Sequence, residues 1–377
     1  MWRLIISIIL FLLSLLVLFK APTNFFWRVQ VVVTEFPYIS IFLAVLFFIS
    51  CMSAEKYRLI LIGLSAITTF IYCLPIIEVY FRGRRLEEEL SKNFTFEKRE
   101  TYLQSPFSIL KLFRGIGIEE QEPEILIYKE LPEKKLAIDF YKSNSKNVSP
   151  CIFVIHGGSW AGGDSRQLPA LNSYLSQRGY HVAAINYRLA PKYKSPSQVE
   201  DAHDALTYLK QNSRALNIDT LNFVLLGRSA GAQIALVGAY TYHDPAIKGV
   251  VSLYGPADMV WGARIKSNKL VLNTDQVFTD YLGGLIAELP EKYHEASSFD
   301  FVDQSSPPTL LVHGPNDALV SYYHSVRLDK KLSKNQVPHY FLNLPWATHG
   351  CDYNINGPSG QITTYTIERF INSVTKK

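Results

Sequence analysis

A serine flanked by glycines, at the point where an apolar strand gives way to a helix, constrains the fold more than any other feature of the sequence. The pentapeptide Gly227-Arg228-Ser229-Ala230-Gly231 follows an apolar run at 221–226 and opens a helical stretch at 230–240. Glycines on both sides relieve crowding around a residue held in a strained backbone conformation. The N-terminus of the following helix also favours negative charge that develops beside the serine. The motif therefore predicts a strand, a sharp turn and a helix that expose Ser229 as a nucleophile.

The surrounding sequence has the alternation of an α/β sheet. After Pro123, short apolar runs alternate with helical stretches. We expect an opening pair of strands at 125–129 and 136–141, then buried, mostly parallel strands at 151–155, 181–186, 221–226, 250–254 and 309–313, and a last strand at 337–344. Helices are expected at 168–178, 196–211, 230–240, 322–332 and 360–373. Residues 121–377 are enough for one α/β domain, and the stretch near 255–306 interrupts the alternation, as a cap-like insertion over the site would.

A second motif follows the strand expected at 151–155. It reads His156-Gly157-Gly158-Ser159-Trp160. A tetrahedral intermediate needs backbone N–H groups aimed at its oxyanion, and small residues let the chain approach that oxygen closely. We therefore expect an oxyanion hole made of Gly157, Gly158 and the amide of Ala230, with Trp160 as a substrate-binding residue.

The serine needs a base and the base needs an orienting carboxylate, in the chain order serine, acid, histidine. Asp317 comes just past the strand expected at 309–313, and His349 follows the strand expected at 337–344. Both lie at carboxyl ends of strands, as Ser229 does, where open α/β sheets gather their catalytic groups. The predicted catalytic residues are therefore Ser229, Asp317 and His349. Asp303 and Asp352 are weaker candidates because neither directly follows a strand; His313 is expected to be structural and Cys351 an improbable nucleophile.

These two motifs, their spacing and the contexts of Asp317 and His349 resemble the esterase/lipase branch of the α/β-hydrolase superfamily, from about Pro123 to the C-terminus. The chain is similar to the hormone-sensitive-lipase-like carboxylesterases, and His-Gly-Gly-x-Trp resembles kynurenine formamidases and isoprenylcysteine methylesterases. The resemblance implies an α/β-hydrolase fold and hydrolysis of esters or amides without a metal or cofactor. Ser159 departs from the pattern, since many lipase-like members have a third glycine there, and an oxyanion contact from that position is not carried over.

The first 80 residues have a different character. Apolar runs at 4–19, 36–54 and 59–77 are about 16 to 19 residues long, close to the ~20 that span a bilayer core. We expect a membrane region with about three transmembrane helices at 1–80, although the first run could instead be a cleaved secretory signal. With three spans, the basic residues on the two sides are Lys20, Arg28, Arg82, Arg84 and Arg85 against Arg3, Lys56 and Arg58. This imbalance favours a cytoplasmic catalytic domain.

Residues 81–120 are expected to form a charged, amphipathic linker. Its apolar residues at 107–113 are interspersed with Lys111, and they could either lie on the membrane surface or cover the catalytic domain. The formal net charge of +5 is modest, and no basic stripe with interleaved aromatic residues predicts a nucleic-acid partner. The sequence contains no phosphate loop and no paired Cys/His metal-ligand spacing, so no cofactor is expected.

The sequence thus predicts a membrane-anchored serine hydrolase that cleaves carboxylic esters through an acyl-enzyme. Trp160, Trp261 and the membrane anchor favour an apolar or lipid-derived ester as its substrate. Two alternatives stay open: a serine peptidase or amidase with the same triad, and a catalytically inactive membrane scaffold with a hydrolase fold. The oligomeric state is not predicted.

Overall fold

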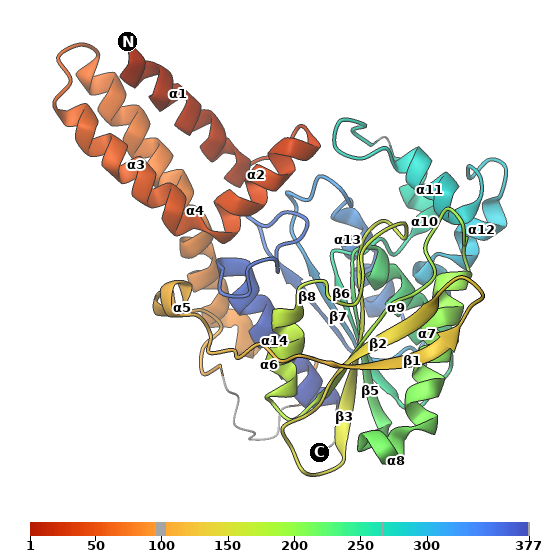
Figure 1. The fold of residues 1–377 in the computed structure, drawn as a ribbon. Helices are drawn as coiled ribbons and strands as arrows, with labels where there is room; N and C mark the ends of the chain where they lie inside the picture. The colour runs from red at the N-terminus through yellow and green to blue at the C-terminus, as the bar shows by residue number, and fades with distance from the viewer. Residues whose placement is uncertain (96–102, 266, 376–377) are drawn as a thin grey trace.

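An eight-stranded sheet forms the centre of the molecule. The computed structural model describes residues 1–95, 103–265 and 267–375 (Figure 1). The strands, in chain order, are β1 (Glu124–Glu130), β2 (Lys135–Tyr141), β3 (Ser149–Ile155), β4 (His181–Ile185), β5 (Ile218–Arg228), β6 (Ile247–Leu253), β7 (Thr309–His313) and β8 (His339–Asn343). Their order across the sheet is β1-β2-β4-β3-β5-β6-β7-β8. The β1–β2 and β2–β4 pairs are antiparallel and all the others are parallel. The expected mostly parallel sheet is confirmed, and the structure shows that its opening pair of strands is antiparallel.

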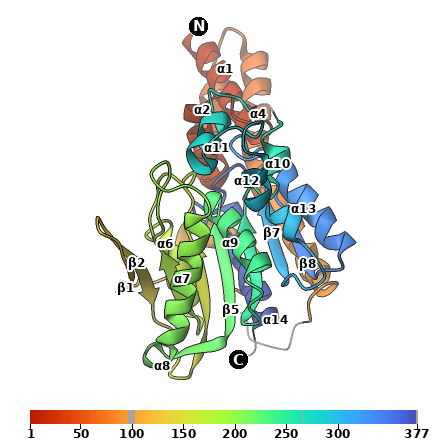
Figure 2. The same ribbon diagram turned by 90° about the vertical axis from the view of Figure 1, so that its right-hand side faces the viewer.

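Helices cover both faces of this sheet. They are α6 (Pro169–Ser176), α7 (Ser197–Gln211), α8 (Ser213–Leu216), α9 (Ala230–Thr241), α13 (Tyr323–Lys334) and α14 (Pro358–Val374). Because successive strand residues point to opposite faces, Phe153 packs in a core with α7, α9 and α13, whereas Val154 packs in a second core with α6 and α14. Figure 2 shows α7, α9 and α13 on the side of the sheet that faces the viewer. Each strand and helix expected from residue 125 onward is present, with ends within three residues of those expected.

The stretch at 255–306 lies between β6 and β7 and is mostly short helices. It contains α10 (Met259–Gly262), α11 (Thr274–Leu282), α12 (Pro290–Glu295) and the 3₁₀ turn η2 (Ser298–Phe301). The segment where the sequence alternation breaks is thus occupied by short helices between two neighbouring strands. It continues from the carboxyl end of β6, the same edge of the sheet at which Ser229 lies.

A single long helix, α4 (Arg58–Ser91), joins the N-terminal helices to the α/β domain. Its first part packs against α1 (Trp2–Ser14) and α3 (Pro37–Met52), and its last turns pack on α14. Leu86 and Leu90 are fully buried in the core that α14 also covers, and Arg369 lies 2.7 Å from the carboxylate of Glu87. The linker expected to begin at residue 81 therefore starts inside a continuous helix that is docked on the sheet. Residues 96–102 of that expected linker lie outside the described residues.

The short helix α5 (Ile109–Arg114) follows. Leu112 is buried, whereas Ile109, Leu110 and Phe113 are exposed, and Phe113 packs against Tyr38 at the start of α3. The side of α5 that carries Leu112 is thus buried, while Ile109, Leu110 and Phe113 remain exposed.

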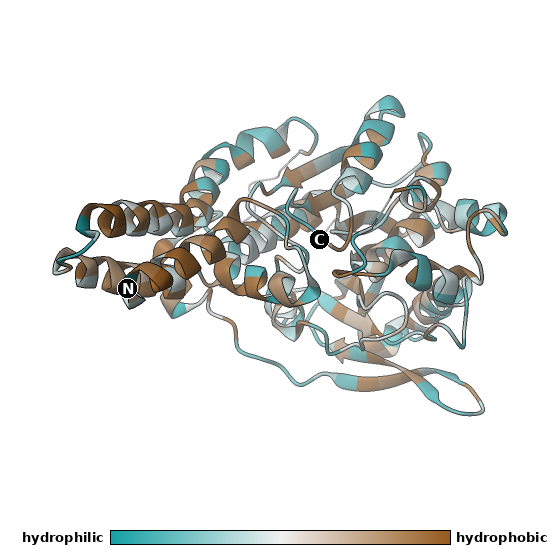
Figure 3. Ribbon diagram, turned by 90° about the horizontal axis from the view of Figure 1, so that it is seen from above, coloured by the Kyte–Doolittle hydropathy of each residue, from teal (hydrophilic) through white to brown (hydrophobic). Residues whose placement is uncertain are grey.

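The three apolar runs form helices α1, α3 and the first part of α4, but only one of these reaches full spanning length. Of the helices in the described ranges, α4 is long and apolar enough to cross a membrane by itself. Helix α2 (Asn24–Glu35) and α3 pass the same test only as a pair, and they are bent by 86° relative to each other. Helices α1 and α3 have 13 and 16 residues, fewer than the ~20 that a bilayer core needs. Figure 3 shows that the projecting N-terminal helices are predominantly apolar.

Helix α2 ends in a carboxylate that is buried against the α/β domain. One Glu35 oxygen accepts a hydrogen bond from the Ser359 hydroxyl at 2.7 Å, and the other accepts one from the Ser359 amide at 3.1 Å, in the first turn of α14. The side-chain amide of Asn354 also donates to the Glu35 carbonyl oxygen at 2.8 Å. Burial raises the pKa of Glu35 to about 8, and the two hydrogen bonds from Ser359 offset this rise only in part.

This raised pKa predicts that stability falls as pH rises. Because the folded protein keeps the Glu35 proton up to about pH 8 and the unfolded chain loses it near its ordinary value, folding loses stability between these two pH values. We expect the unfolding midpoint in detergent to fall by roughly 5 °C between about pH 6 and pH 8.5. Glu35→Gln should abolish most of that fall, and thermal unfolding at both pH values measures it. An equal fall in wild type and variant would contradict this role for Glu35.

Candidate active site

Ser229 occupies the sharp turn between β5 and α9, in the backbone conformation that the motif requires. Its φ is 52° and its ψ is −120°, an unusual combination for a residue with a side chain. A Cβ atom on Gly227 would lie 2.2 Å from the Gly231 carbonyl oxygen, and one on Gly231 would lie 2.2 Å from the Ile155 carbonyl oxygen. Both flanking glycines are therefore required by close backbone approach, and they fix the turn that presents Ser229.

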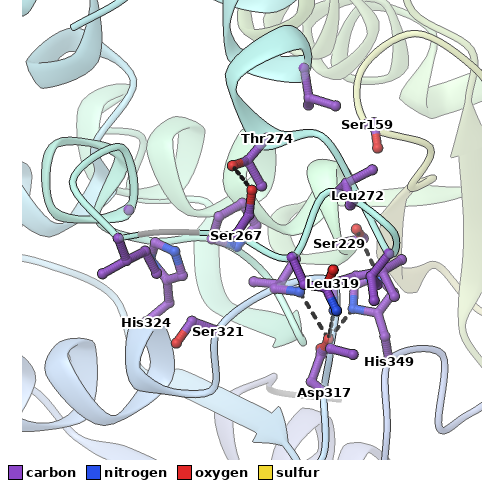
Figure 4. Close-up of a pocket in the computed structure, with 18 of the residues that line it drawn as sticks. Ser159, Ser229, Ser267, Leu272, Thr274, Asp317, Leu319, Ser321, His324 and His349 are labelled. Carbon is purple, nitrogen blue, oxygen red and sulfur yellow. Dashed lines mark hydrogen bonds and ion pairs between the residues drawn. The ribbon is translucent and has the colours of Figure 1, made fainter. Parts of the chain in front are cut away.

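The three residues predicted to act together are hydrogen-bonded in a row. Nε2 of His349 lies 3.0 Å from Oγ of Ser229, and Nδ1 of His349 lies 2.7 Å from Oδ2 of Asp317 (Figure 4). Ser229 and His349 are 120 positions apart in the chain, so only the fold brings them together. In this arrangement the imidazole can accept the serine proton while the carboxylate orients the ring.

Asp317 is held by four hydrogen bonds. Oδ1 accepts from the amides of Leu319 and Val320 at 2.8 and 2.9 Å, and Oδ2 accepts from His313 Nε2 at 2.9 Å as well as from His349. Burial alone would raise the pKa of Asp317, but the charge of His349 and the hydrogen bonds from both histidines hold it well below its usual range. Asp317 is therefore ionised at neutral pH.

His313 has a closer relation to the site than the sequence suggested. Besides its contact with Asp317, its Nδ1 lies 2.8 Å from Oγ of Ser325. Because an ionised carboxylate can only accept, Nε2 of His313 carries the proton in the contact with Asp317. It was expected to be only a structural histidine. The sequence feature that could have indicated this contact is the position of His313 at the end of β7, four residues before Asp317.

The other acids and the cysteine considered from the sequence have different partners. Asp352 forms a buried ion pair with Arg228, at 2.6 Å, and accepts a hydrogen bond from Tyr254 at 2.6 Å. Asp303 accepts hydrogen bonds from Ser305 in an exposed turn. Burial raises the pKa of the Cys351 thiol, which keeps it protonated and poorly nucleophilic. The Arg228–Asp352 pair behind the nucleophile turn was not anticipated.

The predicted oxyanion hole needs one correction. The amide of Gly157 donates to the side-chain oxygen of Gln167 at 2.7 Å, so it is not free to bind an oxyanion. Among the residues that the structure describes, the amides of Gly158, Ser159 and Ala230 have no acceptor. Ser159 has a φ of 53°, so the loop can place a non-glycine residue at that turn. The available donors are therefore Gly158, Ser159 and Ala230.

A pocket of about 420 Å³ opens in front of Ser229 (Figure 4). The insertion contributes apolar side chains to its wall, among them Val271, Leu272, Val277 and Phe278, and the N-terminal region contributes Lys20, Ala21 and Pro22. Trp160 also lines the pocket but is only 2% exposed, since it stacks on Tyr281 and donates its indole N–H to Gln233 at 2.9 Å. Its main contact is therefore with the core behind the pocket. Within the described ranges, no group of His, Cys, Asp and Glu residues could hold a metal ion.

Comparison with known proteins agrees with this fold. Esterase LipC of Mycobacterium tuberculosis is 26% identical over 271 residues, which cover 66% of this chain and 64% of the relative. The probable carboxylic ester hydrolase LipM of the same organism is 25% identical, over 60% of this chain and 55% of the relative. The chain thus spans less than two thirds of the length of these relatives. Among solved structures, a bacterial heroin esterase superposes with a TM-score of 0.58 at 19% identity, covering 69% of this chain and 87% of that structure.

These likenesses confirm the resemblance to the esterase branch of the α/β-hydrolase superfamily. At this identity the structural likeness shows the fold alone. The BD-FAE family model matches residues 138–332, which include β3 with the glycine loop, Ser229 and Asp317. Because that match takes in more than half of the chain, the protein belongs to the BD-FAE family.

Proposed function

We propose that the protein is a membrane-anchored serine esterase that cleaves carboxylic esters through an acyl-enzyme on Ser229. The observation that carries this proposal is the hydrogen-bonded row of Ser229, His349 and Asp317 facing a pocket. That the relatives are named as esterases and as a carboxylic ester hydrolase supports the choice of ester.

The reaction follows from the positions of the donors and acceptors. His349 takes the proton of the Ser229 hydroxyl as Oγ attacks the carbonyl carbon, and ionised Asp317 stabilises the imidazolium that forms. The amides of Gly158, Ser159 and Ala230 bind the negative oxygen of the tetrahedral intermediate; a single donor of this kind contributes about 3 kcal/mol to lowering the barrier. His349 then gives its proton to the leaving alkoxide. Water attacks the acyl-enzyme with His349 again as the base, and the acid product leaves.

Two features support an apolar or lipid-derived ester. The wall that the insertion contributes is apolar, and large apolar side chains are exposed on the segments beside the pocket: Leu18, Phe19, Phe25 and Leu270. Several large apolar side chains exposed beside a pocket are typical of lipid or protein contact. The projecting helices α1, α3 and α4 lie next to it and form the proposed membrane anchor.

The catalytic domain is proposed to lie on the cytoplasmic side, because the basic residues after the third apolar run remain the largest cluster beside the anchor. Protease protection in sealed vesicles measures this orientation. Digestion of the domain from the cytoplasmic side is the expected result, and protection would reverse the assignment.

Fluorophosphonate labelling of the detergent-solubilised protein, followed by peptide mapping, tests the nucleophile. We expect one labelled peptide, which contains Ser229. A folded protein that takes up no label and turns over no ester would favour the inactive scaffold instead.

A series of p-nitrophenyl acyl esters then sizes the pocket. Because each buried methylene contributes about 0.8 kcal/mol, kcat/KM should rise by up to about fourfold per added methylene until the pocket is full. A matched anilide series separates an esterase from an amidase or peptidase. Flat kcat/KM with acyl length would contradict an apolar acyl site, and faster cleavage of the anilides would favour the amidase.

A further inference from the structure

We propose that the N-terminal segment 15–35, here called the docking segment, is part of the active site and positions the loops that carry Asp317 and His349. The docking segment contains the turn after α1 and helix α2 (Figure 1). It lies outside residues 138–332, the region that the BD-FAE family model matches. The proposal rests on the proposed function, because it concerns residues that orient the base and the acid.

The residue before the base is bonded to the docking segment. The hydroxyl of Thr348 donates to Oε1 of Gln30 at 3.0 Å. Gln30 is 0% exposed, and its side-chain amide donates to the carbonyl oxygens of Leu16 and Phe19 at 2.7 and 2.9 Å. The buried side chain of Gln30 thus connects the turn at the start of the docking segment to the loop that carries His349.

The base itself is also contacted. The indole N–H of Trp27 donates to the carbonyl oxygen of His349 at 3.0 Å, and the two rings meet edge to face with centroids 6.3 Å apart. These residues are 322 positions apart in the chain. Trp27 therefore holds both the backbone and the ring of His349.

The residue before the acid is held in the same way. The side-chain amide of Asn316 donates to the carbonyl oxygen of Val17 at 2.9 Å. The carbonyl oxygen of Asn316 lies 3.3 Å from the Thr348 hydroxyl and shares its single proton with Gln30. The acid loop and the base loop are therefore joined to each other and to the docking segment. Both follow the last residues of parallel strands, where the sheet no longer fixes the backbone.

The docking segment also closes one side of the pocket. Lys20, Ala21 and Pro22 line it, and the chain there is hydrogen-bonded to the insertion, which also contributes to the pocket wall. The Asn24 amide donates to the Leu270 carbonyl oxygen at 2.9 Å, and the side chain of Asn268 donates to the Pro22 carbonyl oxygen at 2.8 Å. The docking segment thus touches the base loop, the acid loop and the insertion.

These contacts give the docking segment a positioning role. A catalytic base that is displaced by about 1 Å can lose about a hundredfold in rate. The sheet pairing of β7 with β8 does not extend into the loops that follow these strands. The docking segment supplies hydrogen bonds to these loops beside both proposed catalytic side chains. The proposed membrane anchor and the catalytic loops therefore form one continuous unit.

The test compares Thr348→Val with Thr348→Ser and Gln30→Met. Valine keeps the shape of Thr348 without its hydroxyl, whereas serine keeps the hydroxyl. We expect Thr348→Val and Gln30→Met each to lower kcat by about tenfold with KM changed by less than about threefold. Thr348→Ser should restore kcat to within about twofold of wild type. The loss in the double variant should be smaller than the sum of the two single losses, because both variants remove the Thr348–Gln30 hydrogen bond.

Gln30→Met also leaves the carbonyl oxygens of Leu16 and Phe19 without their donor. A second pair of variants leaves those two hydrogen bonds in place. Trp27→Phe keeps a ring but removes the N–H donor, and the control Trp2→Phe makes the same change in α1, where the side chain is exposed. We expect Trp27→Phe to slow both turnover and fluorophosphonate labelling by about tenfold while the final amount of label is unchanged. Trp2→Phe should match wild type in both.

The outcomes separate this proposal from the proposed function. An unlabelled, inactive wild type would overturn the serine esterase itself. An active wild type with Thr348→Val and Trp27→Phe at full kcat, or with additive losses in the double variant, would overturn the positioning role and leave the esterase standing. Thermal unfolding of every variant is measured alongside, and a loss of kcat that follows only from a lowered midpoint would count against positioning.

Discussion

Replacing Ser229 by alanine is expected to lower kcat by about a millionfold, to the background rate that the remaining site supports. The hydroxyl is the only part of the side chain that reaches His349, and without it no acyl-enzyme can form. The fold should persist, since alanine fits the half-buried position with little change in volume. Ester turnover and fluorophosphonate labelling measure the effect, and circular dichroism confirms the fold.

Ser267→Ala is the matched control for this change. Ser267 also lines the pocket, but its hydroxyl is bonded to Thr274 at 2.8 Å. Labelling and turnover close to wild type are expected for this variant. Substantial activity in Ser229→Ala would exclude Ser229 as the nucleophile, and a loss in both variants would point to pocket shape instead.

Asp317→Asn is expected to lower kcat by about ten-thousandfold. The amide removes the negative charge that stabilises the imidazolium of His349, and its NH₂ group cannot accept the protons that His349 and His313 donate to Oδ2. Because burial of Asp317 is offset by its contacts with the two histidines, the variant should also unfold at a lower temperature. Steady-state kinetics at saturating ester and thermal unfolding measure the two effects.

Asp303→Asn provides the control, since it makes the same change at one of the two weaker candidate acids. Asp303 lies in an exposed turn with Ser305 and has no contact with His349 among the described residues. Its kcat should stay within about twofold of wild type. An Asp317→Asn variant that keeps a tenth or more of wild-type kcat would remove Asp317 from the catalytic role.

Local sequence was sufficient for most of the sheet and for the turn at Ser229. Fully buried strands such as β3 have continuous apolar runs, because parallel strands are covered on both faces. Gly227 and Gly231 specify the turn at Ser229 because no side chain fits at either position. The sequence also located Asp317 and His349, because parallel topology brings the carboxyl ends of neighbouring strands to one edge.

The amides proposed to bind the oxyanion could be predicted only in part. The small residues after β3 indicated the loop, but the choice among its amides depends on Gln167, which binds the amide of Gly157. Nothing in the glycine pattern specifies that contact, because it depends on where the chain returns ten residues later. Likewise, the position of His313 at the end of β7 predicts that it lies near Asp317. Its second contact, with the Ser325 hydroxyl, depends on how α13 packs and could not be predicted.

The sequence by itself thus determined the strands, the helices, the strained turn at Ser229 and the chain order of the acid and the base. These depend on periodicity and on residues a few positions apart, where one residue directly restricts the next. The tertiary structure decided that α2 lies against the catalytic loops and that Trp27 and Gln30 reach His349 and Thr348. From the sequence, hydropathy indicated only that the first 80 residues are rich in apolar segments. The contacts between residues some 300 positions apart depend on tertiary packing, which no local sequence pattern specifies.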